Sequence, residues 1–482
     1  MNRIFKLIDG RQIPYVAILF FGLLAMTARN AIDPDLWWHL RTGQWITETR
    51  QIPHFDPFSF TRAGAPWVAH EWLLEIAFFE LWKHLGYTAL IIFSSIVTSA
   101  GLMLLYARCK SRPQWAAAAT ALGALAAAPS WGVRPQMFTF TLTALLLWLV
   151  EHGEQKPRLL LSIPAIFLLW LNLHAGFALA PALLLAYGVG LLCELALGRT
   201  GWVDVRPLIL RVGLLLVAMA AMVPLNPSGA QLFSYPFTTL SSVGMRSYIS
   251  EWFSPDFHQL IYTPTIVLWL LLVVALAFSS SRPKMRVLLP LFFAAAASLD
   301  AARHIPIFVL LAVPVIATLP DRWSPLVPWK AGIRLDRLQP LFNIGVIVLI
   351  AAFAVSKWVI AGRHQAIREA EVYPESAIQS LISAKSSGRI LAYYDWGGYV
   401  IWKLYPDWRV FVDGRADLFG DDLVESTIEL RTDWKAALNT WRVDTVLLPP
   451  SCALTQALLI DSDWQSVFSD ARAVIFIRKR RA

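Results

Sequence analysis

The chain has 482 residues, of which 57% are hydrophobic and 16% are charged, whereas soluble proteins carry about 25% charged residues. Its mean hydropathy is +0.53. This balance excludes an ordinary soluble enzyme and a disordered chain, and it predicts an α-helical polytopic membrane protein.

Apolar stretches of about the length of a membrane span recur along the first three quarters of the chain. They predict a transmembrane domain over residues 1–360 with eleven spans. We expect these spans at 13–29, 86–107, 114–130, 136–151, 158–174, 176–195, 207–224, 261–280, 286–300, 305–320 and 339–360.

Lys and Arg are concentrated in alternate loops between these stretches. The basic segments are 1–12, 108–112, 156–158, 199–206, 282–286 and 322–337. Because Lys and Arg accumulate in cytoplasmic loops, we expect a cytoplasmic amino terminus and, with eleven spans, an extracytoplasmic carboxyl terminus. The net charge of +9 then reflects membrane topology, and no nucleic-acid partner is expected.

The longest predicted outer loop, 30–85, directly follows the first span. The Asp33-Pro34-Asp35 turn predicts a Trp-rich helix with Asp33 as its cap. A second, amphipathic helix is expected at 69–85, lying along the membrane surface.

The same loop collects carboxylates and imidazoles, the groups that base catalysis or metal binding requires. These residues are Asp33, Asp35, His39, His54, Asp56, His70 and Glu71. If a divalent metal ion binds, its expected ligands are Asp33, Asp35 and His70. The structural alternatives are helix capping for Asp33 and turn formation for Asp56, which precedes a proline.

Further polar residues fall at the predicted outer ends of later spans. Arg134, Arg303 and His304 are cations on the side where cations are scarce, which favours a phosphate ligand because Arg binds phosphate through paired hydrogen bonds. An acidic partner for Arg134 and an Asp300–Arg303 ion pair are the alternatives. His174 and Glu251 are candidates for the same pocket, with helix capping as the alternative for His174.

The composition changes near residue 361, where charge rises and β-type runs alternate with helical ones. We predict a soluble extracytoplasmic α/β domain over 361–482. Strands are expected at 389–394, 399–404, 409–412, 445–448 and 473–478, and helices at 417–440 and 452–460. Asp413 and Arg415 are candidates for the ligand pocket, although Asp413-Gly414 is also a common turn pair.

Acidic residues just after the first span, a long first outer loop, many spans and an outer soluble tail resemble the GT-C class of membrane glycosyltransferases. This class includes the protein O-mannosyltransferases, aminoarabinose transferases and oligosaccharyltransferases. The segments DPDLWWHLRTGQWI, PHFDPFSFT, PWVAHEWLLE, WLNLHAGF, WGGYVIWKLYP and VFVDGRADLFG look like those of a group of bacterial membrane proteins over nearly the whole chain. The Asp-Pro-Asp pattern replaces the adjacent Asp-Glu of O-mannosyltransferases, and no WWD-type acceptor motif is present in the tail.

The resemblance implies an inverting glycosyltransferase of the hexosyltransferase type at the outer face of the bacterial inner membrane. Its donor would be a sugar linked to polyprenyl phosphate, and its acceptor a hydroxyl of a glycan, lipid or protein. The implied roles are Asp35 or Asp33 as the base, His70 and Glu71 as groups that orient the acceptor or hold a metal ion, and Arg303, His304 and Arg134 as partners of the phosphate. The competing interpretations are a transporter or flippase of lipids or lipid-linked sugars, and a non-enzymatic envelope assembly protein.

Overall fold

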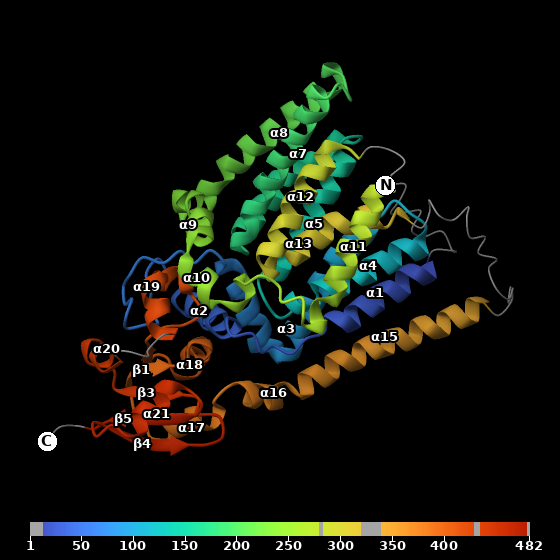
Figure 1. The fold of residues 1–482 in the computed structure, drawn as a ribbon. Coiled ribbons are helices and arrows are strands. Elements are labelled where there is room, and N and C mark those ends of the chain that lie inside the picture. Colours follow the sequence, from blue (N-terminus) through green and yellow to red (C-terminus); the bar gives the residue numbers. More distant parts are fainter. Residues whose placement is uncertain (1–12, 279–282, 320–338, 429–433, 480–482) are drawn as a thin grey trace. The chain divides into compact units, whose positions relative to one another are not determined.

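The computed structural model describes all residues except 1–12, 279–282, 320–338, 429–433 and 480–482 (Figure 1). The basic segments at 1–12 and 322–337, and Arg282, therefore lie outside the described residues. Contacts divide the chain into two compact units. The first comprises Met1–Arg29, Ile91–Asn226 and Glu251–Ala361, and the second comprises Asn30–Leu90, Pro227–Ser250 and Gly362–Ala482. The segment predicted as the long first outer loop therefore packs with the carboxyl-terminal tail. The end of the transmembrane domain at residue 360 stays a prediction.

The first unit is helical, because continuous apolar runs satisfy their backbone hydrogen bonds within each helix. A helix occupies every stretch in which a span is predicted. The helices are α1 (Ile13–Thr27), α3 (Trp72–Arg108), α4 (Pro113–Ala127), α5 (Gln136–Gly153), α6 (Ile163–Leu171), α7 (Leu179–Ala196), α8 (Trp202–Met222), α11 (Thr263–Ala277), α12 (Met285–Asp300), α13 (Ile305–Ile316) and α15 (Gln339–Arg363). The first part of α3 and the end of α15 belong to the second unit.

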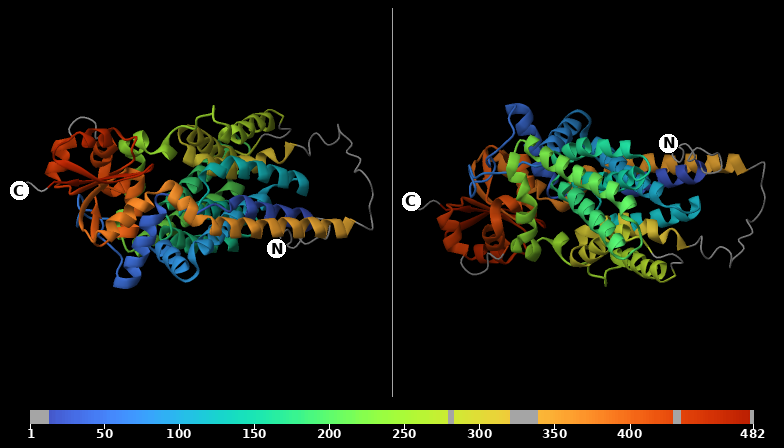
Figure 2. Two further views of the ribbon diagram at one scale, coloured as in Figure 1. Left: turned by 90° about the horizontal axis from the view of Figure 1, so that it is seen from below. Right: turned by 90° about the horizontal axis from the view of Figure 1, so that it is seen from above.

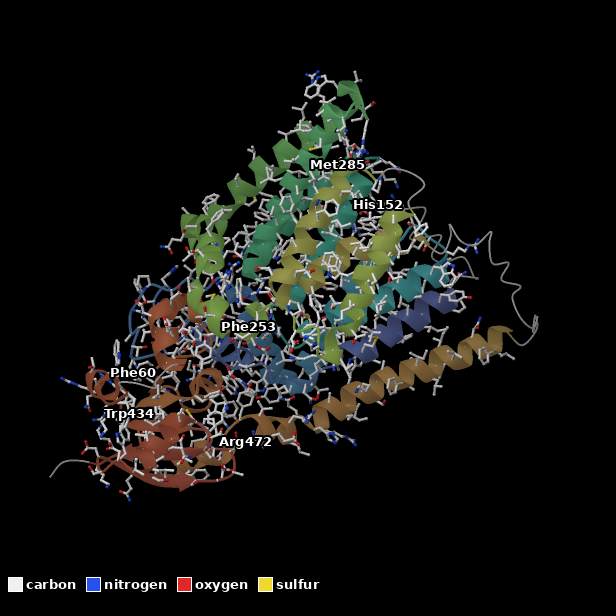
Figure 3. The ribbon with its side chains drawn as sticks, in the orientation of Figure 1. Phe60, His152, Phe253, Met285, Trp434 and Arg472 are labelled. Atoms are coloured by element: carbon white, nitrogen blue, oxygen red, sulfur yellow. The ribbon has the colours of Figure 1, made fainter. Side chains whose placement is uncertain are left out.

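Within the described residues, five helical segments are long and apolar enough to cross a membrane. They are Trp72–Arg108, Ala175–Ala196, Trp202–Leu225, Leu260–Ala277 and Leu341–Arg363. Large apolar side chains on α8, α11 and α15 are exposed, among them Leu214, Leu270 and Leu349. Figure 3 shows the side chains that project from the helices. Such faces suit a lipid surrounding. The span number of eleven stays a prediction.

A break in α3 separates the predicted surface helix from the predicted span that follows it. Gly86 has φ 72° and ψ −172° inside the helix, a backbone conformation that glycine adopts without steric cost. The chain therefore changes direction at the position where the amphipathic pattern of 69–85 gives way to the apolar pattern of 86–107.

The second unit combines the outer loop with the tail. Its further helices are α2 (Leu36–Thr49), α9 (Tyr235–Ser241), α10 (Val243–Tyr248), α16 (Gln365–Val372), α17 (Glu375–Ser383), α18 (Gly397–Leu404), α19 (Ala416–Ile428), α20 (Trp434–Thr440) and α21 (Ala453–Leu459). Its strands are β1 (Gly388–Ala392), β2 (Trp408–Val410), β3 (Thr445–Leu448), β4 (Trp464–Ser469) and β5 (Val474–Arg478). The strand order is β2-β1-β3-β5-β4, and helices of the tail lie beside the strands in Figure 2.

The sheet is parallel on one side and antiparallel on the other. Strand β1 pairs in parallel with β2 and β3, whereas β5 pairs antiparallel with β3 and β4. The predicted α/β character of the tail is therefore present in the structure, with the buried strands β1 and β3 at its centre.

One strand prediction in the tail is wrong, and one strand is missed. The run 399–404 forms helix α18, in which Tyr399, Val400, Ile401 and Leu404 are all buried; a short, fully buried helix has the same apolar run as a buried strand. Strand β4 is not predicted, because most of its residues are exposed and carry no alternating apolar pattern.

Candidate active site

The acidic turn after the first span lies at the start of α2. The helix begins at Leu36, and the N-cap residue is Asp35 rather than the predicted Asp33. Asp33 acts one step earlier, since its Oδ1 accepts a hydrogen bond of 3.0 Å from the backbone N–H of Asp35. Asp35 makes no side-chain cap hydrogen bond. Both carboxylates are half-buried.

The carboxylate of Asp35 contacts the tail segment that carries the Asp-Gly-Arg sequence. Its Oδ1 accepts a hydrogen bond of 3.1 Å from Trp38 Nε1, and a Cβ added to Gly414 would collide with the same oxygen. Gly398, at the start of α18, approaches the same turn, because a Cβ there would lie 2.8 Å from the carbonyl oxygen of Pro34. Glycines at these two positions therefore let the tail approach the acidic turn.

Arg415 joins the tail to the outer loop. Its side chain is 1% exposed and donates to both carboxylate oxygens of Asp413 at 2.7–2.8 Å and to Asp56 Oδ1 at 2.8 Å. The guanidinium also lies over the Trp67 ring, 4.6 Å from its centroid. Burial alone would lower the pKa of Arg415, but the charges of Asp413 and Asp56 outweigh it and raise that pKa. Asp56 is therefore more than a turn residue.

A buried group of one imidazole and two carboxylates lies between α2 and α3. His39 Nε2 is 3.2 Å from Glu71 Oε2, and His39 Nδ1 is 3.1 Å from Glu75 Oε1. All three residues are buried. Because two buried carboxylates facing one neutral imidazole would leave uncompensated charge, the group must share at least one additional proton or hold a cation.

This is the group of His, Cys, Asp and Glu residues in the described part of the chain whose atoms lie close enough to hold a metal ion. It differs from the predicted ligand set Asp33, Asp35 and His70, which stays a prediction. Glu75 Oε2 is buried and has no hydrogen-bond partner among the residues that the structure describes. The nitrogen and oxygen donors suit zinc and other first-row divalent metals.

His70 extends the group toward α9 and α19. Its Nε2 is 3.4 Å from Glu71 Oε1, and its ring lies 4.6 Å from the ring of Tyr235. Tyr235 donates a hydrogen bond of 3.0 Å to Asp417 Oδ2. Burial alone would lower the pKa of His70, but Glu71 and Asp417 outweigh it, so that the pKa is raised.

Two tail residues before α18 complete the acidic cluster. Burial raises the pKa of the Tyr394 hydroxyl, and the charges of Asp35 and Asp413 raise it further. The Tyr394 hydroxyl oxygen is buried and has no hydrogen-bond partner within the structure. Burial and then the charge of Asp33 raise the pKa of Asp395. We use the name acidic cluster for Asp33, Asp35, His39, His70, Glu71, Glu75, Tyr394, Asp395, Asp413 and Asp417.

The structure therefore unites residues that lie far apart in the sequence. Arg415 connects the cluster member Asp413 with Asp56 of the loop through hydrogen bonds to both carboxylates. Glu75, Tyr394 and Asp395 are the members that sequence reasoning missed. The signal for Glu75 was present, because its spacing of four residues from Glu71 places both on one helix face. His54 is exposed, with a backbone hydrogen bond to Trp67, and the structure does not bring it into these contacts.

The predicted phosphate partners lie in the other unit and form a group of their own. Glu251 is 2.6 Å from Arg134 and 3.4 Å from Arg303, and the Arg303 guanidinium lies 4.2 Å from the centroid of the Trp252 ring. Burial alone would raise the pKa of Glu251, but the two arginines outweigh it and lower that pKa. Arg134 therefore has an acidic partner in the structure, and the same residue, Glu251, also pairs with Arg303.

The two candidate histidines of the first unit, His174 and His304, have structural contacts. His174 Nδ1 is 2.7 Å from Thr139 Oγ1 and accepts a hydrogen bond from the backbone N–H of Gly176, which caps the following turn. His304 Nδ1 is 3.2 Å from the carbonyl oxygen of Ala297. These contacts fit the capping alternative for His174, and the ligand roles of both residues stay predictions.

Comparisons with known proteins identify the fold. No family model and no curated protein sequence matches the chain. Among solved structures, the chain is similar to an oligosaccharyltransferase, AglB of Archaeoglobus fulgidus in complex with an inhibitory peptide and a dolichol-phosphate, with TM-score 0.54, 10% identity and coverage of 91% of this chain and 70% of that one. It is also similar to ArnT of Cupriavidus metallidurans bound to undecaprenyl phosphate, with TM-score 0.51, 14% identity and coverage of 97% and 98%.

A further match, the same archaeal oligosaccharyltransferase in complex with Zn and sulfate, has TM-score 0.52, 10% identity and coverage of 90% of this chain and 68% of that one. The predicted GT-C resemblance is thus confirmed at the level of the fold, over 91% and 97% of this chain. At sequence identities of 10–14%, these structural matches show the fold of the chain but not its activity, which must be argued from the residues.

Proposed function

We propose that the chain transfers a sugar from a polyprenyl-phosphate donor to an acceptor hydroxyl at the outer face of the cytoplasmic membrane, with inversion at the anomeric carbon. The observation that carries this proposal is the acidic cluster, in which the turn after the first span meets the tail at Asp35 and Gly414. The shared fold supports it, since the matched transferases are described with dolichol-phosphate and undecaprenyl phosphate.

The base is assigned to the acidic turn. A carboxylate at this position takes the proton of the acceptor hydroxyl as the oxygen attacks the anomeric carbon, and the bond from that carbon to the lipid phosphate breaks. Asp35 and Asp33 both remain candidates. The hydrogen bond from Trp38 orients Asp35, and that from a backbone N–H orients Asp33.

The proposed supporting roles follow from charge. His70 and Glu71 position the acceptor, with the raised pKa of His70 favouring an imidazolium beside Glu71. Arg303, His304 and Arg134 stabilise the phosphate that leaves. Arg134 and Arg303 both form ion pairs with Glu251. To bind the lipid phosphate, each guanidinium must therefore donate to the phosphate as well as to Glu251.

A divalent metal ion would be held by His39, Glu71 and Glu75, and it would supply positive charge to the acidic cluster. The unpartnered Glu75 Oε2 fits a role as a ligand atom. A chelator tests the requirement: transfer that is lost in EDTA and restored by Mn²⁺ or Zn²⁺ in the wild type, but not in Glu75→Gln, assigns the ion to this group.

The proposed function is tested by transfer of radiolabelled sugar from polyprenyl-phosphate donors in membranes that contain the wild type, Asp33→Asn or Asp35→Asn. Loss of a general base costs about 10²–10⁴-fold in rate, so we expect one variant to lose that much. Asp407→Asn, at an exposed position of the tail that is outside the acidic cluster, is the matched control. Full activity in both Asp variants would remove the base assignment. If the wild type moves lipid-linked sugar across vesicle membranes without transfer, the flippase alternative replaces the proposal.

A further inference from the structure

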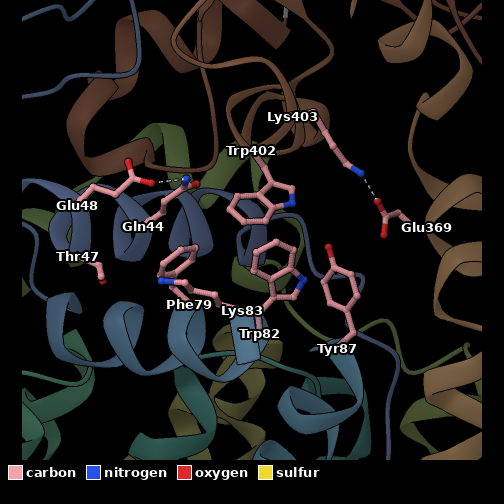
Figure 4. Close-up of a pocket in the computed structure, with 10 residues that line it drawn as sticks. All are labelled: Gln44, Thr47, Glu48, Phe79, Trp82, Lys83, Tyr87, Glu369, Trp402 and Lys403. Atoms are coloured by element: carbon pink, nitrogen blue, oxygen red, sulfur yellow. Dashed lines mark hydrogen bonds and ion pairs between the residues drawn. The ribbon is translucent and has the colours of Figure 1, made fainter. Parts of the chain in front are cut away.

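The second unit contains a cavity whose lining shares no residue with the acidic cluster. Its volume is about 610 Å³, and the carboxyl-terminal half of α2, the first part of α3, α16 and the end of α18 line it (Figure 4). That volume is in the range of small-molecule sites. We call it the aromatic groove. Its walls are formed by Trp82, Trp402, Phe79 and Tyr87, with polar side chains between them.

Two indoles form the principal wall of the aromatic groove. The ring centroids of Trp82 and Trp402 are 4.7 Å apart, and the rings are nearly perpendicular at 83°. Tyr87 lies next to Trp82 at 6.1 Å. Indole faces carry negative electrostatic potential, which attracts the polarised C–H groups on the flat face of a pyranose.

The charges of the groove are balanced by neighbours in the same unit. Lys403 Nζ is 2.9 Å from Glu369 Oε1 and 3.4 Å from Glu375 Oε2, and Gln44 donates a hydrogen bond of 2.7 Å to Glu48. Lys83 also lines the groove, with its Nζ 5.7 Å from the centroid of the Phe79 ring. The lining thus carries two lysines and two glutamates, so that the groove offers donors and acceptors without a net charge. Such a surface suits the hydroxyls of a neutral ligand better than a phosphate, which selects unpaired Arg or Lys.

The groove lies further along α2 than the acidic turn at Asp35. Asp35 precedes the first turn of α2 and Gln44 lies nine positions later, which corresponds to about 13 Å along the helix at 1.5 Å per residue. Helix α18 runs in the same sense, with Gly398 next to Pro34 and Arg41 4.8 Å from the ring of Tyr405 just beyond its end. A chain of a few sugar residues spans this distance.

We propose that the aromatic groove binds a neutral oligosaccharide, the internal sugars of a glycan acceptor whose terminal hydroxyl reaches the acidic cluster. The identity of the occupant as the acceptor rests on the proposed function, whereas saccharide binding by the groove does not. This assigns the acceptor to the glycans among the glycan, lipid and protein classes that the sequence left open.

The test is calorimetric titration of the full chain in phosphatidylcholine nanodiscs, which avoid detergents with sugar headgroups that would compete. The probes are maltohexaose, chitohexaose and cellohexaose, with an oligogalacturonate of the same length as the acidic comparison. We expect at least one neutral hexasaccharide to bind and Trp402→Ala and Trp82→Ala to weaken it at least tenfold. Because no unpaired cation is needed, raising the salt from 50 to 500 mM should change its Kd less than about twofold.

The controls separate the groove from the proposed chemistry. Trp45→Ala, on the same helix but outside the groove lining, should bind the saccharide as the wild type does. Binding with these properties in a chain that transfers no sugar would sustain the groove and remove only the acceptor role. No binding by any neutral hexasaccharide, equal binding by Trp402→Ala, or stronger binding of the oligogalacturonate would overturn the inference. Loss of a bound lipid instead of a saccharide in Trp402→Ala would assign the groove to lipid.

Discussion

Asp35 and Gly414, 379 positions apart in the sequence, are in direct contact: a Cβ at Gly414 would collide with the Asp35 carboxylate. Glycine is required here for close approach of the tail, and the atom that it accommodates is the end of a short side chain. A larger residue would therefore move the carboxylate rather than the backbone of the tail.

Gly414→Ala should lower the rate of sugar transfer at least tenfold, because a displacement of about 1 Å at a reacting group has effects of this size. The melting temperature should change little, since the Asp35 side chain can rotate away. Gly213→Ala, where nothing lies within 4 Å of the added Cβ, is the control. A large loss of stability in Gly414→Ala with unchanged transfer would contradict the close role of Asp35.

Arg415→Met should destabilise the second unit by about 3–5 kcal/mol, because it leaves the buried carboxylates of Asp413 and Asp56 without their cation. Chemical denaturation followed by fluorescence measures this loss. Arg368→Met removes an exposed Arg368–Glu371 pair and should cost less than about 1 kcal/mol. Equal effects of the two substitutions would show that the buried network does not hold the outer loop to the tail.

The raised pKa of His70 predicts a defined pH dependence. Its protonated form stabilises the fold, and this contribution is complete below the unfolded value of about 6.5 and is lost as the pH rises through the higher folded pKa. The melting temperature of the wild type should therefore exceed that of His70→Gln most at pH 6. The difference should shrink toward pH 9. A difference that is constant across this range would assign His70 a purely packing role.

The raised pKa of Asp395, caused by burial and by Asp33, also predicts a stability that falls as the pH rises, here because the charged form is the unfavourable one. The ionised carboxylate destabilises the fold, and this cost appears as the pH rises from about 3.9, the unfolded value, through the folded pKa. Asp395→Asn should raise the melting temperature at pH 7 by about 1 °C or more and have little effect near pH 3.5. The gain should be smaller in an Asp33→Asn background, because the repulsion is then absent.

Local sequence was sufficient for much of the helical unit. The apolar runs predict helices where the structure has them, since a helix completes its backbone hydrogen bonds within its own segment. The change of pattern at Gly86 also marks the real break in α3. Where a short buried run allows two structures, as at 399–404, local pattern failed, because burial on all sides removes the periodicity that distinguishes helix from strand.

By itself, the sequence determined the helical class of the chain, the α/β character of the tail and the identity of most candidate residues, because residue chemistry and hydrophobic period are local properties. Only the tertiary structure decided which of those residues act together. Asp35 lies against Gly414, and Arg415 pairs with Asp56 and Asp413. Glu75 contacts His39. Glu251 pairs with both Arg134 and Arg303. Contacts between distant segments depend on packing and on the balance of buried charge, which no local pattern records.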